Sequence, residues 1–149
     1  MKTTVFGAGA VGGHLAARLG AAGADVAAVC RGAQLAAIQE RGITLHTQDR
    51  RYHARIRATD RPEILGRQDV VIVTVKSSVL PEMASSIATL VGPDTSIVFA
   101  MNGIPWWYPY RAESKARPRI CRDSTRTARL SARLVTSGSS AAWSIRRTR

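Results

Sequence analysis

The glycines near the N-terminus have the spacing of a phosphate-binding turn. Gly7, Gly9 and Gly12 form a G-x-G-x-x-G pattern that follows a short apolar segment and precedes an Ala/Leu-rich one. The first glycine permits a tight turn, the second lets backbone N–H groups approach a pyrophosphate, and the third allows close helix packing. A helix that begins here directs unpaired N–H donors and a partial positive charge at the phosphates. The pattern predicts a dinucleotide site formed by Gly7, Ala8, Gly9, Ala10, Val11 and Gly12.

One arginine bears on which dinucleotide such a site accepts. Arg31 follows the apolar segment that ends at Cys30. A site for NAD usually places Asp or Glu at this point to hold the ribose 2′-OH, whereas a 2′-phosphate needs a cation and no nearby carboxylate. The sequence supplies the cation and no adjacent acid, which favours NADP. The alternative is an ordinary solvated arginine.

Two further polar residues follow apolar segments. Lys76 comes after Val70–Val75 and can place an ammonium beside a phosphate, a ribose hydroxyl or a substrate carboxylate. Asn102 follows Ser96–Ala100 and can offer its amide to a nicotinamide carboxamide or a substrate oxygen. The alternatives are a surface lysine and a simple Asn-Gly turn. We treat both as candidate cleft residues, assign no catalytic residue with certainty, and predict no metal site.

The elements that must position these residues alternate along the chain. Continuous apolar or β-branched runs predict buried strands at residues 3–6, 25–30, 70–75 and 96–100. Helical patterns occupy residues 10 to about 20–23, 33–41 and 81–91. This order predicts an α/β fold, a Rossmann-type doubly wound parallel sheet, in which ligands bind beyond the carboxyl ends of the strands.

A different pattern separates the second predicted helix from the third predicted strand. Residues 43–46 and 52–57 alternate apolar and polar side chains around the polar segment 47–51. This alternation predicts a short hairpin or an extended excursion at the edge of the sheet.

Charge divides the chain of 149 residues into two parts. Residues 1–108 carry 11 basic and 8 acidic residues, a net charge of +3, whereas residues 109–149 carry 11 basic and 2 acidic residues, a net charge of +9. The second part is rich in Arg, Ser and Thr and poor in large aliphatic residues, so it has little apolar surface to offset its ordering entropy. We predict a dinucleotide-binding domain over residues 1–108 and an irregular basic tail over residues 109–149.

Other features restrict the class of protein. The sequence has neither an apolar run long enough to span a bilayer nor the pattern of a signal peptide, which favours a cytoplasmic protein without membrane partners. Cys30 and Cys121 lie far apart and form no metal-ligand cluster with the histidines, so free thiols are expected.

Four motifs together resemble the N-terminal half of the ketopantoate reductase (2-dehydropantoate 2-reductase) family. They are the glycine motif, Arg31-Gly32, Val73-Thr74-Val75-Lys76 and Asn102-Gly103-Ile104-Pro105-Trp106-Trp107-Tyr108. The resemblance implies an NADPH-dependent oxidoreductase that reduces the 2-oxo acid ketopantoate to pantoate, a step toward pantothenate and coenzyme A. It also implies that Gly7, Gly9 and Gly12 form the pyrophosphate loop and that Arg31 contacts the 2′-phosphate. Lys76 and Asn102 would lie near the nicotinamide and substrate.

The resemblance ends at Tyr108. In the family a helical domain follows and supplies the general-acid lysine, an acidic substrate-binding residue and the second wall of the cleft. Nothing in residues 109–149 resembles that domain, so we expect a truncated form that binds NADPH without turnover. Our hypothesis is that the tail is translated out of frame from a GC-rich gene. Restoring the frame near codon 109 of the parent DNA should then reveal the family sequence.

Two other classes of protein remain as alternatives. One is a stand-alone NADP-binding domain without catalysis. The other is a nucleic-acid-binding protein that uses its basic tail, because Arg-rich segments attract phosphate regardless of sequence. The tail lacks a recognisable nucleic-acid-binding motif, which disfavours the second alternative.

Overall fold

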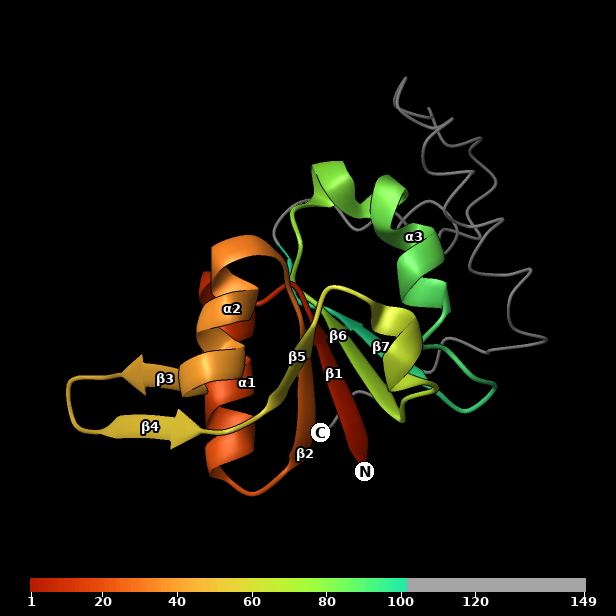
Figure 1. Ribbon diagram of the computed structural model, residues 1–149. Helices are drawn as coiled ribbons and strands as arrows, with labels where there is room; N and C mark the ends of the chain where they lie inside the picture. The colour runs from red at the N-terminus through yellow and green to blue at the C-terminus, as the bar shows by residue number, and fades with distance from the viewer. Residues whose placement is uncertain (102–149) are drawn as a thin grey trace, which may run out of the picture.

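The computed structural model describes residues 1–101, which form a parallel sheet with helices on both faces (Figure 1). The sheet has five strands in the order β5-β2-β1-β6-β7, and every neighbouring pair is parallel. The strands are β1 (Lys2–Phe6), β2 (Asp25–Val29), β5 (Arg57–Thr59), β6 (Val70–Val73) and β7 (Ser96–Phe99). The chain builds outward from β1 to β5 and then returns to the other side of β1 for β6 and β7. The predicted Rossmann-type doubly wound sheet is confirmed.

The helices divide between the two faces of this sheet. One apolar cluster joins α1 (Ala10–Ala21) and α2 (Gly32–Arg41) to the sheet, and a second joins α3 (Leu80–Ala88) to its opposite face. Figure 1 shows α3 on the side away from α1 and α2. Two short 3-10 helices, η1 (Pro62–Leu65) and η2 (Ser77–Val79), flank β6 in sequence.

The central strand β1 is buried on both faces from Thr3 to Phe6. Val5 belongs to the cluster under α1, whereas Phe6 belongs to the cluster under α3, and both are buried. Successive side chains of a strand point to opposite faces, so a strand covered on both sides cannot alternate apolar with polar residues. The continuous apolar runs in the sequence follow from this double burial.

Helix ends agree with the glycine and proline signals. α2 ends at Arg41, and Gly42 adopts a φ of +74°, a left-handed conformation that favours glycine. In α3, Pro81 lies in the first turn, where its missing N–H has no intrahelical partner to lose. The end of α2 and the start of α3 therefore follow from local backbone chemistry. The predicted end of the third helix at residue 91 is wrong, because α3 ends at Ala88 and the N–H groups of Leu90 and Val91 make turn bonds to the carbonyl oxygens of Ile87 and Ala88.

The excursion between α2 and β6 differs from the prediction. β3 (Ile43–His46) and β4 (Arg51–Ala54) form an antiparallel hairpin, but this hairpin is a separate two-stranded sheet that packs against α1. The predicted strand over residues 52–57 is wrong as a continuous element. β4 ends at Ala54, and β5 begins at Arg57 and pairs with β2 in the main sheet.

The physical reason for this break lies where the chain passes α1. A Cβ atom on Gly20 would lie 2.7 Å from the Cβ of Ala54 and 2.9 Å from Cγ2 of Ile56. Gly20 thus leaves room for the chain to cross the helix between the two sheets. Local alternation of side chains reports two extended segments but cannot report that they belong to different sheets.

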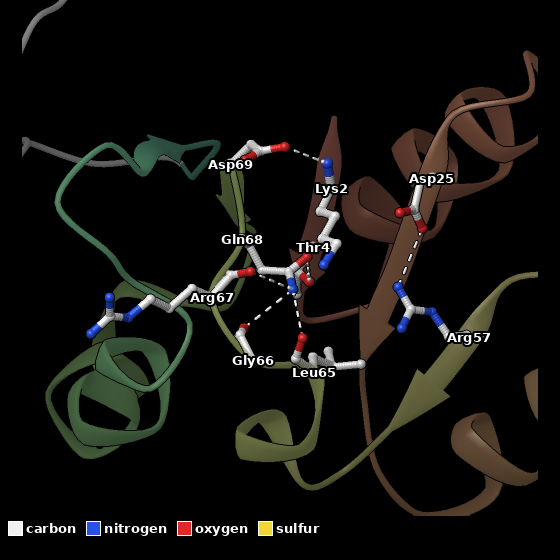
Figure 2. Close-up of polar contacts among 9 residues, drawn as sticks. All are labelled: Lys2, Thr4, Asp25, Arg57, Leu65, Gly66, Arg67, Gln68 and Asp69. Atoms are coloured by element: carbon white, nitrogen blue, oxygen red, sulfur yellow. Dashed lines mark hydrogen bonds and ion pairs between the residues drawn. The ribbon is translucent and has the colours of Figure 1, made fainter.

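The side-chain amide of Gln68 is buried near the amino ends of β1 and β6 (Figure 2). Gln68 is 3% exposed, and its Nε2 donates to the carbonyl oxygens of Leu65 at 2.9 Å and Gly66 at 3.2 Å. The hydroxyl of Thr4 donates to Oε1 of Gln68 at 3.0 Å. Because a buried polar group without a partner is costly, this set of bonds fixes the segment before β6 against β1.

Removing the Thr4 hydroxyl should destabilise the domain. Thr4→Val keeps the shape of the side chain but leaves the buried Oε1 of Gln68 without this donor, which should lower the free energy of unfolding by about 1–3 kcal/mol. Thr3→Val is the matched control, because Thr3 is also buried but its hydroxyl makes no hydrogen bond among residues 1–101. Urea denaturation measures both; equal effects of the two substitutions would contradict this role of Gln68.

Candidate cofactor site

The last residues of the five strands lie in one row across the sheet. Strand register pairs Phe6 with Val29 on one side and with Val73 on the other, and it pairs those two with Thr59 and Phe99. The residues that follow each strand therefore leave the sheet at a common edge. These are Asp60 after β5, Cys30 after β2, Gly7 after β1, Thr74 after β6 and Ala100 after β7. This edge is where the fold class binds its ligands.

Gly7 makes the turn from β1 into the loop. Its N–H donates to the carbonyl oxygen of Val29 at 2.9 Å, and its φ of +101° lies in the region that favours glycine. A Cβ atom here would also lie 2.8 Å from Cγ1 of Val75. Both the backbone conformation and the space available therefore require glycine at this position.

Gly12 lets α1 approach the sheet. A Cβ atom at Gly12 would collide with the carbonyl oxygen of Gly7 and with the hydroxyl of Thr74. The first turn of α1 consequently packs directly on the loop and on the end of β6. This is the close packing that the third glycine of the pattern predicted.

Gly9 has a different environment from the other two glycines. It is exposed and is the N-cap of α1, and no atom lies within 4 Å of the Cβ position built on it. The N–H groups of Ala8 and Gly9 donate to no acceptor within residues 1–101. Neither a capping side chain nor an acidic residue occupies the first turn of α1. The open space at Gly9 and the acid-free first turn therefore let an anion approach this end of α1 without steric or electrostatic opposition.

Arg31 is the N-cap of α2, one residue beyond β2. Its side chain is exposed and makes no hydrogen bond or ion pair within residues 1–101. The first turn of α2 also contains no acidic residue. Arg31 therefore lies at the ligand-binding edge with its guanidinium available.

Lys76, another predicted site residue, follows β6, which lies on the opposite side of β1 from β2. Lys76 is exposed and immediately precedes η2, two residues beyond Thr74. The predicted strand over residues 70–75 ends earlier, at Val73, because Thr74 turns toward the glycine loop. Asn102 lies outside the described residues, as do Trp106, Trp107 and Tyr108.

Three residues at this edge were not singled out by sequence reasoning: Gln34, Asp60 and Thr74. Thr74 and Gln34 donate hydrogen bonds to carbonyl groups of the glycine loop. Asp60 brings a carboxylate to the edge from β5, a strand that the sequence placed in a hairpin. The one available signal was Thr74, the only polar residue in the run Val70–Val75.

The carboxylate of Asp60 affects its neighbour across the sheet. The N–H of Cys30 donates to the carbonyl oxygen of Thr59 at 3.0 Å, which places Asp60 beside the end of β2. Burial raises the pKa of the Cys30 thiol, and the negative charge of Asp60 raises this pKa further. Cys30 is thus a neutral, buried thiol. The same carboxylate lies near the position of Arg31, so the expectation of a cation without a nearby acid needs this correction.

Among residues 1–101, no group of three or more His, Cys, Asp and Glu side chains is arranged to hold a metal ion. No helix in this part of the chain has the length and apolar character needed to cross a membrane.

The fold and this edge define the class of protein: a Rossmann-type α/β domain. The family model described as ketopantoate reductase PanE/ApbA matches residues 3–127. This chain therefore belongs to the ketopantoate reductase PanE/ApbA family. The family match continues past Tyr108, the last residue of the motifs that suggested the family.

Individual relatives agree with this assignment. The 2-dehydropantoate 2-reductase of Mesorhizobium japonicum is 47% identical over 109 residues, which cover 72% of this chain and 33% of that protein. A candidate ketopantoate reductase from Ralstonia solanacearum has a crystal structure with a TM-score of 0.80 and 38% identity, covering 92% of this chain and 43% of that one. D-mandelate dehydrogenase, solved with NADH and anilino(oxo)acetate, has a TM-score of 0.63 and 26% identity, covering 70% and 34%. The chain spans about a third of the length of its curated relative.

Substitutions at Gly12 and Gly9 should change stability by different amounts. Gly12→Ala should lower the free energy of unfolding by about 1–3 kcal/mol, because the added methyl group collides with backbone and forces α1 away from the sheet. Gly9→Ala is the matched control; its methyl group enters open space, so only the smaller N-cap preference, within about 1 kcal/mol, should change. Chemical denaturation compares the two variants. A Gly12→Ala protein as stable as Gly9→Ala would show that α1 does not pack as described.

Proposed function

We propose that this chain binds NADPH at the edge formed by the glycine loop, Arg31 and Lys76, as the cofactor-binding part of a ketopantoate reductase. The observation that carries the proposal is the pair of unpartnered N–H groups at Ala8 and Gly9, beside an acid-free N-terminus of α1. Backbone donors and a helix N-terminus are well suited to a pyrophosphate. The residues present therefore fit a dinucleotide.

Each part of the edge would have a separate task. The loop from Gly7 to Gly12 would hold the pyrophosphate, and the open space at Gly9 would admit it. Arg31 would pair with the 2′-phosphate, since a guanidinium forms strong charge-assisted bonds to phosphate oxygens. Lys76 and Asn102 are proposed to lie near the nicotinamide and the substrate, which is the role that the family resemblance implies for them.

The proposed reaction is reduction of a small 2-oxo acid. The Mesorhizobium relative is named for its action on 2-dehydropantoate, and this substrate comes to our chain as a proposal. NADPH, when bound, supplies the hydride. The chain must then orient the ketone and provide a proton to the oxygen that receives negative charge. A place on the route to pantothenate and a cytoplasmic setting, where thiols such as Cys30 stay reduced, belong to the same proposal.

We further propose that this chain alone binds cofactor without efficient turnover. Among residues 1–101, Lys76 is the lysine at the ligand-binding edge, and by resemblance it serves the cofactor side. The family resemblance implies that the general acid comes from a helical domain, and this chain spans about a third of its curated relative. The same coverage favours a second candidate, a stand-alone NADP-binding domain. Titrating ketopantoate into the NADPH-loaded chain separates the two candidates. The cofactor-binding part of a reductase should release heat as it binds ketopantoate, whereas a stand-alone NADP-binding domain should not.

Replacing Arg31 should remove the preference for NADPH over NADH. A charge-assisted hydrogen bond contributes about 1.5–3 kcal/mol, so Arg31→Ala should weaken NADPH binding roughly 10- to 150-fold and leave NADH nearly unchanged. Asp60→Asn should shift the preference the other way, because it removes a negative charge near the 2′-phosphate. Gly9→Val should reduce affinity for both cofactors. Calorimetric titration measures all four proteins; equal affinities of the unmodified chain for NADPH and NADH would disprove the assignment of Arg31.

The chain of 149 residues should show little ketopantoate-dependent oxidation of NADPH even at saturating cofactor. Without a positioned proton donor the rate should fall by a factor of about 10² to 10⁴. Loss of NADPH absorbance is the measurement, and the full-length Mesorhizobium relative is the positive control. Turnover on the order of 1 per second or faster would contradict the proposal and would assign proton donation to Lys76 or to residues beyond 101.

A further inference from the structure

Two side chains from different elements hold consecutive peptide groups of the glycine loop. The hydroxyl of Thr74, just beyond β6, donates to the carbonyl oxygen of Gly7 and lies 3.2 Å from that of Phe6. The side-chain amide of Gln34, on α2, donates to the carbonyl oxygen of Ala8. Neither contact is needed to form the sheet or the helices, since both join side chains to a loop.

Because the peptide group is planar, each of these contacts to a carbonyl oxygen also fixes the direction of the N–H group of the following residue. Residues 1–101 contain no cis peptide bond, and in a trans peptide the C=O and the following N–H point in opposite directions. The Gly7 carbonyl faces Thr74, so the N–H of Ala8 points away from Thr74. The Ala8 carbonyl faces Gln34, so the N–H of Gly9 points away from Gln34.

Both N–H groups so directed lack an acceptor in the described part of the chain. Ala8 is 2% exposed, yet its N–H makes no hydrogen bond within residues 1–101. Buried backbone donors are nearly always paired, so a fixed and unpaired one marks a place where a ligand completes the bonding. Thr74 and Gln34 thus occupy carbonyl groups of the loop, while the N–H groups of Ala8 and Gly9 remain free.

We propose that Thr74 and Gln34 are positioning residues, which aim the N–H groups of Ala8 and Gly9 at the pyrophosphate of the dinucleotide. This inference rests on the proposed function, because it assumes that the loop binds a pyrophosphate. Thr74 has the larger part. Its hydroxyl also occupies the space left by the missing Cβ of Gly12, so it is held between the loop and α1.

The alternative is that Thr74 only fills this space. A valine has nearly the same shape as threonine but no donor, whereas serine keeps the donor and loses the methyl group. Thr74→Val and Thr74→Ser therefore separate hydrogen bonding from packing. Gln34→Met removes the second donor on an exposed helix while keeping the side-chain length, so it tests the inference even if Thr74→Val folds poorly.

The experiment measures affinity of the full chain for two ligands. NADPH contains the pyrophosphate, whereas adenosine 2′-monophosphate offers Arg31 its phosphate but has no pyrophosphate. We expect Thr74→Val and Gln34→Met each to weaken NADPH binding about tenfold, the change expected from one misdirected hydrogen bond. Thr74→Ser should stay within about threefold of the unmodified chain. Affinity for adenosine 2′-monophosphate should not change in any of the three variants.

Every outcome decides the inference. Unchanged NADPH affinity in Thr74→Val and Gln34→Met would overturn it, and so would an equal loss of affinity for both ligands, which would indicate general damage to the domain. If the unmodified chain binds neither ligand, the proposed function fails instead. In that case the amide NMR signal of Ala8 in the free protein tests the inference: Thr74→Val must shift this signal while Thr74→Ser leaves it near its original position.

Discussion

The parallel register of the sheet is the constraint on which the other features of this domain depend. Because Thr59, Val29, Phe6, Val73 and Phe99 lie in one row, five segments distant in sequence leave the sheet at the same edge. A slip of one residue in any pairing would turn the side chains of that strand to the opposite face. The apolar layers on both faces oppose such a slip, so the packing of the core fixes the position of the candidate site.

The two ends of the sheet differ in how completely their polar groups are hydrogen-bonded. Near the amino ends of β1 and β6, the Gln68 amide is buried and its bonding groups are paired. At the carboxyl ends, the carbonyl groups of the glycine loop are paired, but the N–H groups of Ala8 and Gly9 are not. Pairing at one end stabilises the fold, whereas the donors at the other end are left free for the ligand proposed above.

Charge at the site is balanced between two residues from different strands. In the proposed function, Arg31 after β2 would favour a 2′-phosphate, whereas Asp60 after β5 would oppose it. The proposed preference for NADPH would then be a difference between two opposing interactions. This balance is of interest because a solved structural relative, D-mandelate dehydrogenase, carries NADH.

The sequence by itself determined the fold class, most element boundaries and the glycine loop, because these depend on local chemistry. Apolar runs report burial on both faces, and the spacing of Gly7, Gly9 and Gly12 reports backbone requirements within one turn. Only the tertiary structure decided that β5 joins the main sheet, that Asp60 lies beside the end of β2, and that Thr74 and Gln34 hold the loop. Each of these depends on strand pairing or helix packing between residues far apart in the chain, which leaves no periodic signal in the local sequence.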